Sequence, residues 1–322
     1  DPSVIVGTRV NRWNSNARVG KSQWLIFEAD EYREAFLNLN PYGLIITSID
    51  YDHPDYYPTK SSYYRAFKRL ISKVDKRGFV IGFGDDVEVR AALKFAKAKK
   101  LKTLSYGFLK RNDLCLSDKG VFRAKQVFHA LFHKKKTSKG SLLFAGKHNI
   151  LNAGAALLAA NMLKVSMPRA LRALSTFPGT ARRFEVLKTY KNQSKLIDDY
   201  AHHPNEIKAS LQGARALYPR HRLIAVFQPH MFSRTKILLE DFAKAFSEAD
   251  EVVIMEIYPS AREKKRDFKV SSKNLVAAIR QYHRKVSLQK SRAGAKQKVL
   301  KELKQGKTIG LLLGAGDLNY LI

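Results

Sequence analysis

The stretch GLIITSIDYDHPDYY, residues 43–57, begins as an apolar run and ends in acids, a histidine and tyrosines. Its apolar part has the pattern of a β-strand, and polar residues follow directly where the strand ends. The same pattern recurs along the first half, with helical patterns between the apolar runs. Strands are predicted at 23–29, 43–50, 78–84 and 101–108, and helices at about 59–73 and 87–98. This alternation is typical of α/β proteins with mostly parallel sheets.

The remainder of the chain extends this pattern, and a Pro-Gly pair near residue 178 predicts a domain boundary there. Before the boundary we predict a β-rich patch at 113–144 and helices at 148–163 and 167–177. After it we predict a β-hairpin and three strand–helix units, with strands at 222–228, 251–258 and 308–316. Two domains follow, at 1–177 and 178–322.

Length and composition agree with two soluble domains. The 322 residues, 45% of them hydrophobic, are enough for two buried cores. No apolar run approaches the roughly 18 residues of a membrane-spanning helix, and the N-terminus lacks the pattern of a signal peptide. The single cysteine, Cys115, excludes an internal disulfide and fits a reducing compartment. We therefore expect a cytoplasmic protein without membrane partners.

The net charge of +31 comes from 59 Lys and Arg against 28 Asp and Glu. Such a surplus attracts polyanions, including nucleic acid. The lysines, however, occur in short runs attached to amphipathic helices or turns, which is typical of solvated faces. Nucleic acid is therefore not the expected partner, although a basic nucleic-acid-binding protein on a degenerate enzyme scaffold stays the alternative.

Residues 20–22, Gly-Lys-Ser, do not form a phosphate-binding P-loop. The first glycine of that motif is missing, since Ser15 stands in its place, and a strand rather than a helix is predicted after the lysine. The histidine spacing does not favour zinc, and the sequence contains no serine or cysteine nucleophile elbow.

Acidic residues follow two of the predicted strands. Glu28 and Asp30, with Glu31 after them, stand at one strand end and could hold a hard cation such as Mg²⁺. The alternative is that acids are common at strand ends. The next strand end adds four more candidates, which are Asp50, Asp52, His53 and Asp55. For these the alternative is an acidic turn that caps a helix.

Amides and arginines form a second set of candidates. Asn149 and Asn152 are three residues apart on one face of a predicted helix, after Lys147 and His148. Carboxamides can read the edge of a purine, although a helix cap and polar face would also explain them. Arg182 and its neighbour Arg183 suit bidentate contact with phosphate oxygens.

The second half adds acids and histidines at its strand ends. One group precedes a helix that is expected to begin near Pro204. The other follows the strand at 222–228. The candidates are Asp198, Asp199, His202, His203, His230 and Arg234.

Taken in order, the segments EADEY, DHPDYY, HNILN, GTARRF, DDYAHHP, FQPH, SRT and LLLGAGD resemble the Mur ligases of peptidoglycan synthesis, over essentially the whole chain. The resemblance implies a central ATP-binding domain followed by a Rossmann-like C-terminal domain. It implies an ATP-dependent ligase that activates a carboxylate as an acyl phosphate, which an amine then attacks. The branch that adds L-alanine to UDP-N-acetylmuramate is favoured. EADEY and Met231 depart from that branch, so the branch that recycles murein tripeptide stays open.

The resemblance also implies roles for individual residues. It assigns Mg²⁺ to Glu28 and His53, the adenine end of ATP to Asn149 and Asn152, and the phosphates to Arg182. It places Asp198 on the nucleotide side of the C-terminal domain. The residues expected near the substrate carboxylate and the incoming amino acid are His202, His203, His230 and Arg234. Of these, Arg182, His202 and His203 join the two magnesium ligands as expected catalytic residues.

Relatives carry a phosphate loop and a uridine-nucleotide-binding domain upstream, and neither pattern occurs in this sequence. We therefore expect the chain to be an incomplete portion that does not turn over by itself. The sequence predicts no oligomeric state.

Overall fold

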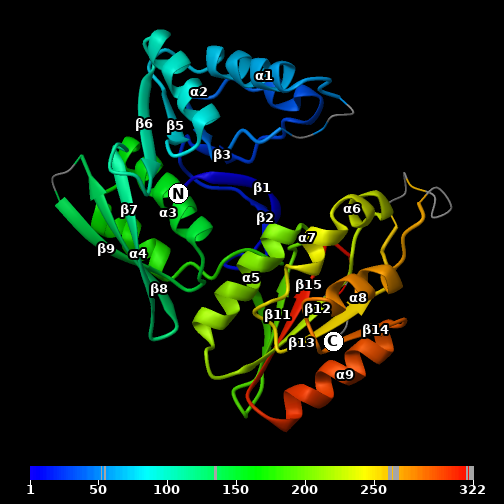
Figure 1. Ribbon diagram of the computed structural model, residues 1–322. Helices are drawn as coiled ribbons and strands as arrows, with labels where there is room; N and C mark the ends of the chain where they lie inside the picture. Colours follow the sequence, from blue (N-terminus) through cyan, green and yellow to red (C-terminus); the bar gives the residue numbers. More distant parts are fainter. Residues whose placement is uncertain are drawn as a thin grey trace. The chain divides into compact units, whose positions relative to one another are not determined.

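The computed structural model describes residues 1–51, 53, 56–133, 136–259, 263, 268–316 and 318. Asp52 and Asp55 of the predicted acidic cluster lie outside these residues. The chain folds into two compact units (Figure 1), which consist of 1–7, 15–143 and 147–178, and of 8–14, 144–146 and 179–322. Within the described part of the chain, no helix combines the length and apolarity needed to cross a membrane.

The main sheet of the first unit has six strands in the order β4-β5-β6-β7-β8-β9. Neighbouring strands from β4 to β7 run parallel, and those from β7 to β9 run antiparallel. The mostly parallel sheet and the β-rich patch predicted from the sequence are therefore confirmed. The strands are β4 (Gly43–Ile46), β5 (Phe79–Phe83), β6 (Lys102–Gly107), β7 (Leu114–Phe122), β8 (Lys125–Phe132) and β9 (Lys136–Leu142).

Helices cover this sheet because each one turns an apolar stripe inward. Buried residues of η1, α1 and α2 form one cluster with those of β4 and β5. Helix α3 packs on β5, β6 and β7, and α4 packs on β9. Side-chain caps at Thr59 and Asp86 set the starts of α1 and α2. The helices are η1 (Tyr32–Asn38), α1 (Lys60–Ser72), α2 (Val87–Ala98), α3 (Lys147–Met162) and α4 (Met167–Ser175).

The strand predicted at 23–29 is shorter, since β3 covers only Leu25–Phe27. It pairs in parallel with β1 (Ser3–Val10), which also neighbours β2 (Ser15–Arg18) in a small sheet. Our sequence analysis missed β1 and β2. Apolar and polar residues mix along β1, and only Val4 and Val10 are buried, so the apolar run that marks the longer strands is absent.

The second unit contains a six-stranded sheet in the order β10-β11-β15-β12-β13-β14. Only β10 runs antiparallel to its neighbour, so five strands end at the same edge. The hairpin and three later strands were predicted, whereas β14 was missed. The strands are β10 (Glu185–Thr189), β11 (Lys195–Asp199), β12 (Arg222–Phe227), β13 (Glu251–Met255), β14 (Val286–Gln289) and β15 (Thr308–Leu313).

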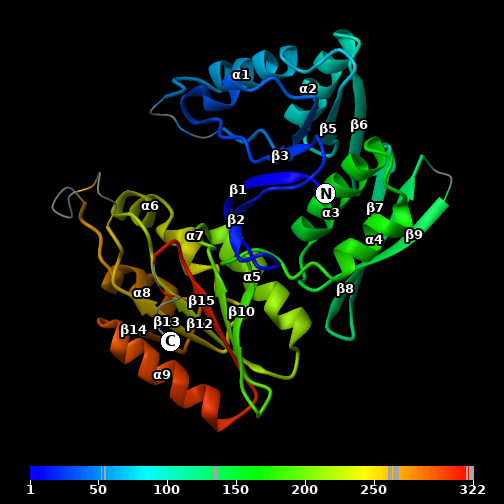
Figure 2. The same ribbon diagram turned by 180° about the vertical axis from the view of Figure 1, so that it is seen from behind.

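Helices cover both faces of this sheet, as Figures 1 and 2 show from opposite sides. Alternate residues of β12 point to opposite faces, so that Phe227 packs with α5, α7 and α8, while Val226 packs with α9. This is the doubly wound arrangement expected of a Rossmann-like domain. The helices are α5 (Pro204–Leu217), α6 (Phe232–Ile237), α7 (Leu239–Ala243), α8 (Ser272–Arg280) and α9 (Arg292–Gln305).

An N-terminal segment, residues 8–14, belongs to the second unit. The Ala181 amide donates to the Arg9 carbonyl at 2.7 Å, and the Arg9 guanidinium pairs with Glu185 at 2.8 Å. A β-bridge joins Val10 to Thr180. The predicted division between residues 177 and 178 stays a proposal, because the second unit also draws on residues far upstream.

Gly78 gives a test of packing in the first unit. A Cβ added there would overlap with the Tyr42 carbonyl oxygen, which accepts the Phe79 amide. We expect Gly78→Ala to lower the free energy of unfolding by about 1–3 kcal/mol, because backbone must move. Gly306→Ala is the control, since a Cβ at Gly306 meets open space. Equal urea denaturation midpoints for the two variants would contradict this reading.

Candidate functional site

The predicted residues of the second unit gather where parallel strands end. Asp198 and Asp199 are the last residues of β11, and Gly314–Gly316 follows β15 beside it. Gln228 follows β12 on the other side of β15. Ligands of open α/β sheets bind at this edge, so the position suits a binding site.

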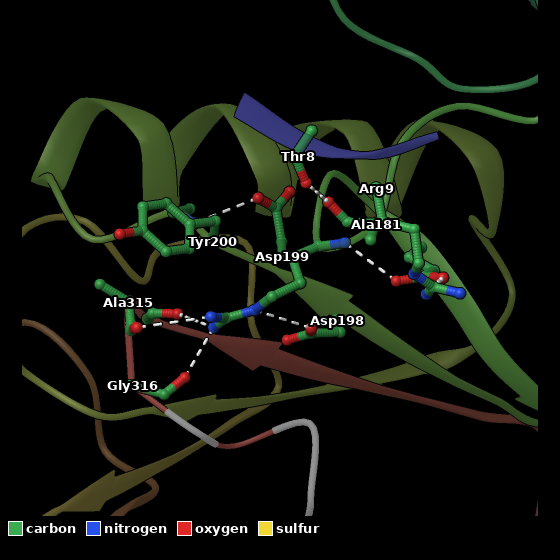
Figure 3. A network of polar contacts seen from close by, with 12 residues as sticks. Thr8, Arg9, Ala181, Asp198, Asp199, Tyr200, Ala315 and Gly316 are labelled. Atoms are coloured by element: carbon green, nitrogen blue, oxygen red, sulfur yellow. Dashed lines mark hydrogen bonds and ion pairs between the residues drawn. The ribbon is translucent and has the colours of Figure 1, made fainter. Parts of the chain in front are cut away.

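Arg182 is bound at this edge by several oxygens, and Figure 3 labels three of the residues that supply them, Asp198, Ala315 and Gly316. The Arg182 Nε donates to the Asp198 carboxylate at 3.2 Å. Its two terminal nitrogens donate to the carbonyls of Gly314, Ala315 and Gly316, at 2.6, 3.4 and 2.7 Å respectively. Arg182 therefore holds the glycine-rich segment in place, and the same guanidinium also lies over the Tyr200 ring.

Asp198 is 1% exposed, and one of its carboxylate oxygens has no hydrogen-bond partner among the described residues. Burial raises its pKa to about 6, although the Arg182 charge and hydrogen bond act in the opposite direction. Asp199 is also buried, and burial raises its pKa. Its carboxylate accepts bonds from the Ser210 hydroxyl at 2.6 Å and the Ala201 amide at 3.1 Å.

His202 and His203 are held by the start of α5. Glu206 accepts the backbone amides of both, at 2.9 and 3.1 Å, while the His203 ring accepts the Asn205 amide. His202 Nδ1 lies 3.0 Å from the Tyr200 carbonyl oxygen. Since a carbonyl only accepts, Nδ1 carries the proton, and Nε2 of the neutral ring is left as an acceptor.

His230 and Arg234 lie near His202 in space. The His230 ring stacks on Tyr258, with centroids 5.7 Å apart. Burial lowers the pKa of His230, and the charges of Arg234 and His202 lower it further. Burial likewise lowers the pKa of His202, and the Arg234 charge contributes. Both imidazoles are therefore held in the neutral form at neutral pH, beside a permanent cation.

In the first unit, Glu28 follows β3 and is exposed. Its carboxylate accepts the Gly7 amide, and its own amide donates to the Ile5 carbonyl. These bonds fix the side chain to β1 while leaving carboxylate lone pairs for a ligand. Asp30, two residues on, accepts the Tyr32 amide at 2.9 Å.

His53 lies beside the same acidic segment. Its Nε2 is 3.4 Å from the Glu31 carboxylate, and its ring contacts that of Tyr32. The Tyr57 hydroxyl donates to the Glu31 carbonyl at 2.5 Å. Burial, followed by the charges of nearby groups, raises the pKa of Tyr57 to about 12, so that it stays protonated. The segment after β3 and the segment after β4 are thus linked through Glu31.

The donors suit Mg²⁺ in type. Glu28 supplies exposed carboxylate oxygen, which Mg²⁺ prefers, and the ion usually keeps several waters beside one or two protein ligands. Among the described residues, no three His, Cys, Asp or Glu side chains are grouped to hold a metal. His53 is directed at Glu31, so direct coordination by His53 stays a prediction.

Asn149 and Asn152 lie on the first two turns of α3. Asn152 is exposed and Asn149 is half-buried, while Ile150 and Ala153 are buried. The polar face predicted from their spacing is therefore present. Their adenine contact stays a prediction.

Comparisons with known proteins identify the family of this chain. The chain matches the Mur ligase middle domain over residues 9–160 and the Mur ligase glutamate ligase domain over residues 182–316. A UDP-N-acetylmuramate–L-alanine ligase of Clostridium perfringens is 36% identical over 98% of this chain and 68% of that protein. The chain belongs to the Mur ligase family.

Other relatives of this Mur ligase chain carry the same name. A UDP-N-acetylmuramate–L-alanine ligase of Caldanaerobacter subterraneus is 38% identical over 87% of the chain and 59% of that protein. The chain therefore spans about three fifths of the length of such relatives. The crystal structure of UDP-N-acetylmuramate-alanine ligase from Thermotoga maritima superposes with a TM-score of 0.82 and 26% identity, covering 99% of this chain and 67% of that one.

Several partners in the candidate site of this Mur ligase chain were missed from the sequence. Glu206 and Tyr200 orient the two histidines, and the carbonyls of Gly314–Gly316 bind Arg182. The sequence contained a pattern that could have predicted Glu206, because it stands three residues after His203 in a capping box. It contained no pattern for the backbone carbonyls, because their contact with Arg182 depends on the pairing of β11 with β15.

Proposed function

We propose that this chain is the central and C-terminal part of an ATP-dependent ligase that adds L-alanine to UDP-N-acetylmuramate. The observation that carries the proposal is the set of relatives with this name, at 36–39% identity over most of the chain. The positions of Glu28, His202 and His230 after strand ends support it. We also propose a cytoplasmic location, as expected for an enzyme that consumes ATP.

The proposed reaction has two steps. A carboxylate oxygen of the sugar acid attacks the γ-phosphorus of ATP, the bond to ADP breaks, and ADP leaves with an acyl phosphate in place. The amine of L-alanine then attacks the acyl carbon, the bond to phosphate breaks, and one proton is released as the amide forms. Such reactions need cations and positioning rather than a protein nucleophile.

The second unit offers groups for the amide-forming step. Neutral His202 has a free acceptor at Nε2 and can take the proton that the amine loses. Arg234 nearby can bind a carboxylate, such as that of the amino acid. Arg182 is engaged by Asp198 and three carbonyls, whereas the neighbouring Arg183 is exposed. We therefore propose that Arg183 shares the predicted phosphate contact with Arg182.

The first unit offers a magnesium site at Glu28, with Glu31 and His53 beside it. A bound magnesium ion would neutralise charge on the phosphates. The chain's own role here is to fix the carboxylate, which Gly7 does through its amide. We propose that Asn149 and Asn152 orient the adenine ring by hydrogen bonds.

Phosphate release tests the proposal. The assay combines ATP and UDP-N-acetylmuramate, with and without L-alanine, and compares the chain alone with the chain joined to the upstream segment of the Clostridium perfringens relative. We expect L-alanine-dependent release only from the joined protein. Release from the chain alone would overturn the expectation that it cannot turn over. No release from either would overturn the proposed function.

A further inference from the structure

A pocket of about 520 Å³ opens in the first unit, between α1 and residues 56–58. Its charged lining consists of Arg65, Lys68 and Arg69 against a single carboxylate, Glu34. The volume lies in the range of small-molecule sites. None of the proposed substrate contacts uses this pocket.

The three cations come from one face of α1. Arg65 is three residues before Lys68 and four before Arg69, which is the spacing of neighbours on a helix surface. Arg69 pairs with Glu34. Arg65 and Lys68 have no carboxylate partner among the described residues, so the pocket holds a positive charge that the described chain does not neutralise. A stable fold has no need of such a cluster, since like charges repel.

Aromatic rings form the uncharged walls. Tyr56 is 41% exposed and lines one side, and Phe95 lines another. The ammonium group of Lys68 lies 5.7 Å from the centre of the Phe95 ring, so this lysine is held at the wall by a cation–π contact. Donors beside flat rings suit a ligand that has an anionic group and a planar or apolar part.

We propose that this pocket binds a phosphate-bearing small molecule, with its phosphate or pyrophosphate on Arg65 and Lys68 and its ring against Tyr56. An arginine fork beside a lysine matches phosphate oxygens, and charge-assisted bonds of this kind are the strong ones. The volume exceeds the need of a bare phosphate. Ser62 and Ser72 also line the pocket, but their hydroxyls already donate to backbone carbonyls, so the cations carry the recognition.

The pocket is a second site that does not depend on the proposed ligase reaction. It nevertheless adjoins the candidate magnesium site, because Tyr57 lines the pocket and donates to the Glu31 carbonyl. The Glu31 carboxylate pairs with His53. A ligand in the pocket would therefore contact the segment that positions His53.

Calorimetric titration of the full chain tests this proposal, with inorganic pyrophosphate, uridine diphosphate and uridine as probes at about 150 mM salt. We expect both phosphates to bind and uridine not to bind. Uridine diphosphate should bind more tightly if the ring contacts Tyr56. Replacing Arg65→Ala together with Lys68→Ala should weaken binding by about tenfold or more, because two charge-assisted contacts are lost.

Two further variants separate the pocket from general charge. Lys119→Ala with Lys125→Ala removes the same charge from the β7–β8 hairpin and should leave the affinity unchanged. Glu34→Gln releases Arg69 and should tighten binding severalfold. The proposal is overturned if no phosphate probe binds, if the double variant in the pocket binds as the unchanged chain does, or if the hairpin variant loses as much affinity.

Discussion

Replacing Arg182 with methionine is expected to lower the free energy of unfolding by about 3–5 kcal/mol near neutral pH, because it leaves a buried carboxylate without its charge partner. Asp198 is 1% exposed, and the guanidinium also holds three carbonyls after β15. Methionine keeps much of the volume, so the loss reports the charge and the hydrogen bonds. Urea denaturation of Arg182→Met measures it.

The stability lost in Arg182→Met should be smaller at acidic pH than at alkaline pH. The pKa of Asp198 is raised from 3.8 to about 6, so its proton is retained in the folded chain after the unfolded chain has lost it. The stability that this proton contributes, about 3 kcal/mol, is complete below the unfolded pKa and is lost as pH rises through the folded pKa. At about pH 5 the carboxyl is largely neutral, so Arg182→Met should cost less there than at about pH 8.

Arg183→Ala is the matched control for Arg182→Met. Arg183 is exposed, and its guanidinium lies 5.8 Å from the centre of the Tyr200 ring. Its removal should therefore change stability by less than about 0.5 kcal/mol. If both arginine variants unfold at the same urea concentration, the contacts of Arg182 with Asp198 and with the carbonyls after β15 do not stabilise the fold. A cost of Arg182→Met that is equal across the pH range would exclude the role of the Asp198 charge.

The second large effect is expected for Glu28→Gln in the chain joined to an upstream segment. The turnover number should fall by about 10²–10³-fold, because an uncharged amide holds magnesium weakly. The fold should persist, since the amide oxygen still accepts the Gly7 amide. Phosphate release with L-alanine measures the loss, and thermal unfolding checks the fold.

A magnesium titration separates a metal role of Glu28 from a purely structural one. If Glu28 binds the ion, raising the magnesium concentration should restore part of the turnover of Glu28→Gln. Asp241→Asn serves as a control, because Asp241 is exposed on α7 in the second unit. Unchanged turnover in Glu28→Gln, or a lower melting temperature with no response to magnesium, would contradict the assignment.

The sequence predicted those features that depend on local pattern. The bounds of α1 and α2 were close because Thr59 and Asp86 cap them, and the ends of β11 and β12 were marked by polar residues after apolar runs. Strand β14 was missed because its four residues, VSLQ, lack a continuous apolar run. Short strands of this kind form because a neighbour, here β13, supplies the pairing.

The sequence predicted which residues lie at the candidate site, but it did not predict the groups to which they are hydrogen-bonded. The sequence marked Arg182 as a phosphate ligand, yet it carried no sign that the carbonyls of Gly314 and Gly316 would bind that side chain. These contacts link residues more than 130 positions apart and arise only when the sheet forms. Residue type therefore indicated which ligands a side chain could bind. The pairing of the strands decided which of its donors are already bound within the protein.

The packing of residues 8–14 into the second unit affects the order in which the chain can fold as it is synthesised. Arg9 leaves the ribosome about 170 residues before Ala181 and Glu185, the groups that it binds. Until then the Arg9 carbonyl and the guanidinium nitrogen that pairs with Glu185 must bind water or transient partners, whereas Asn14, the third partner, is only five residues away. The second unit can close this contact only late in synthesis, and an isolated segment 179–322 would have to fold with the Glu185 carboxylate lacking its Arg9 partner.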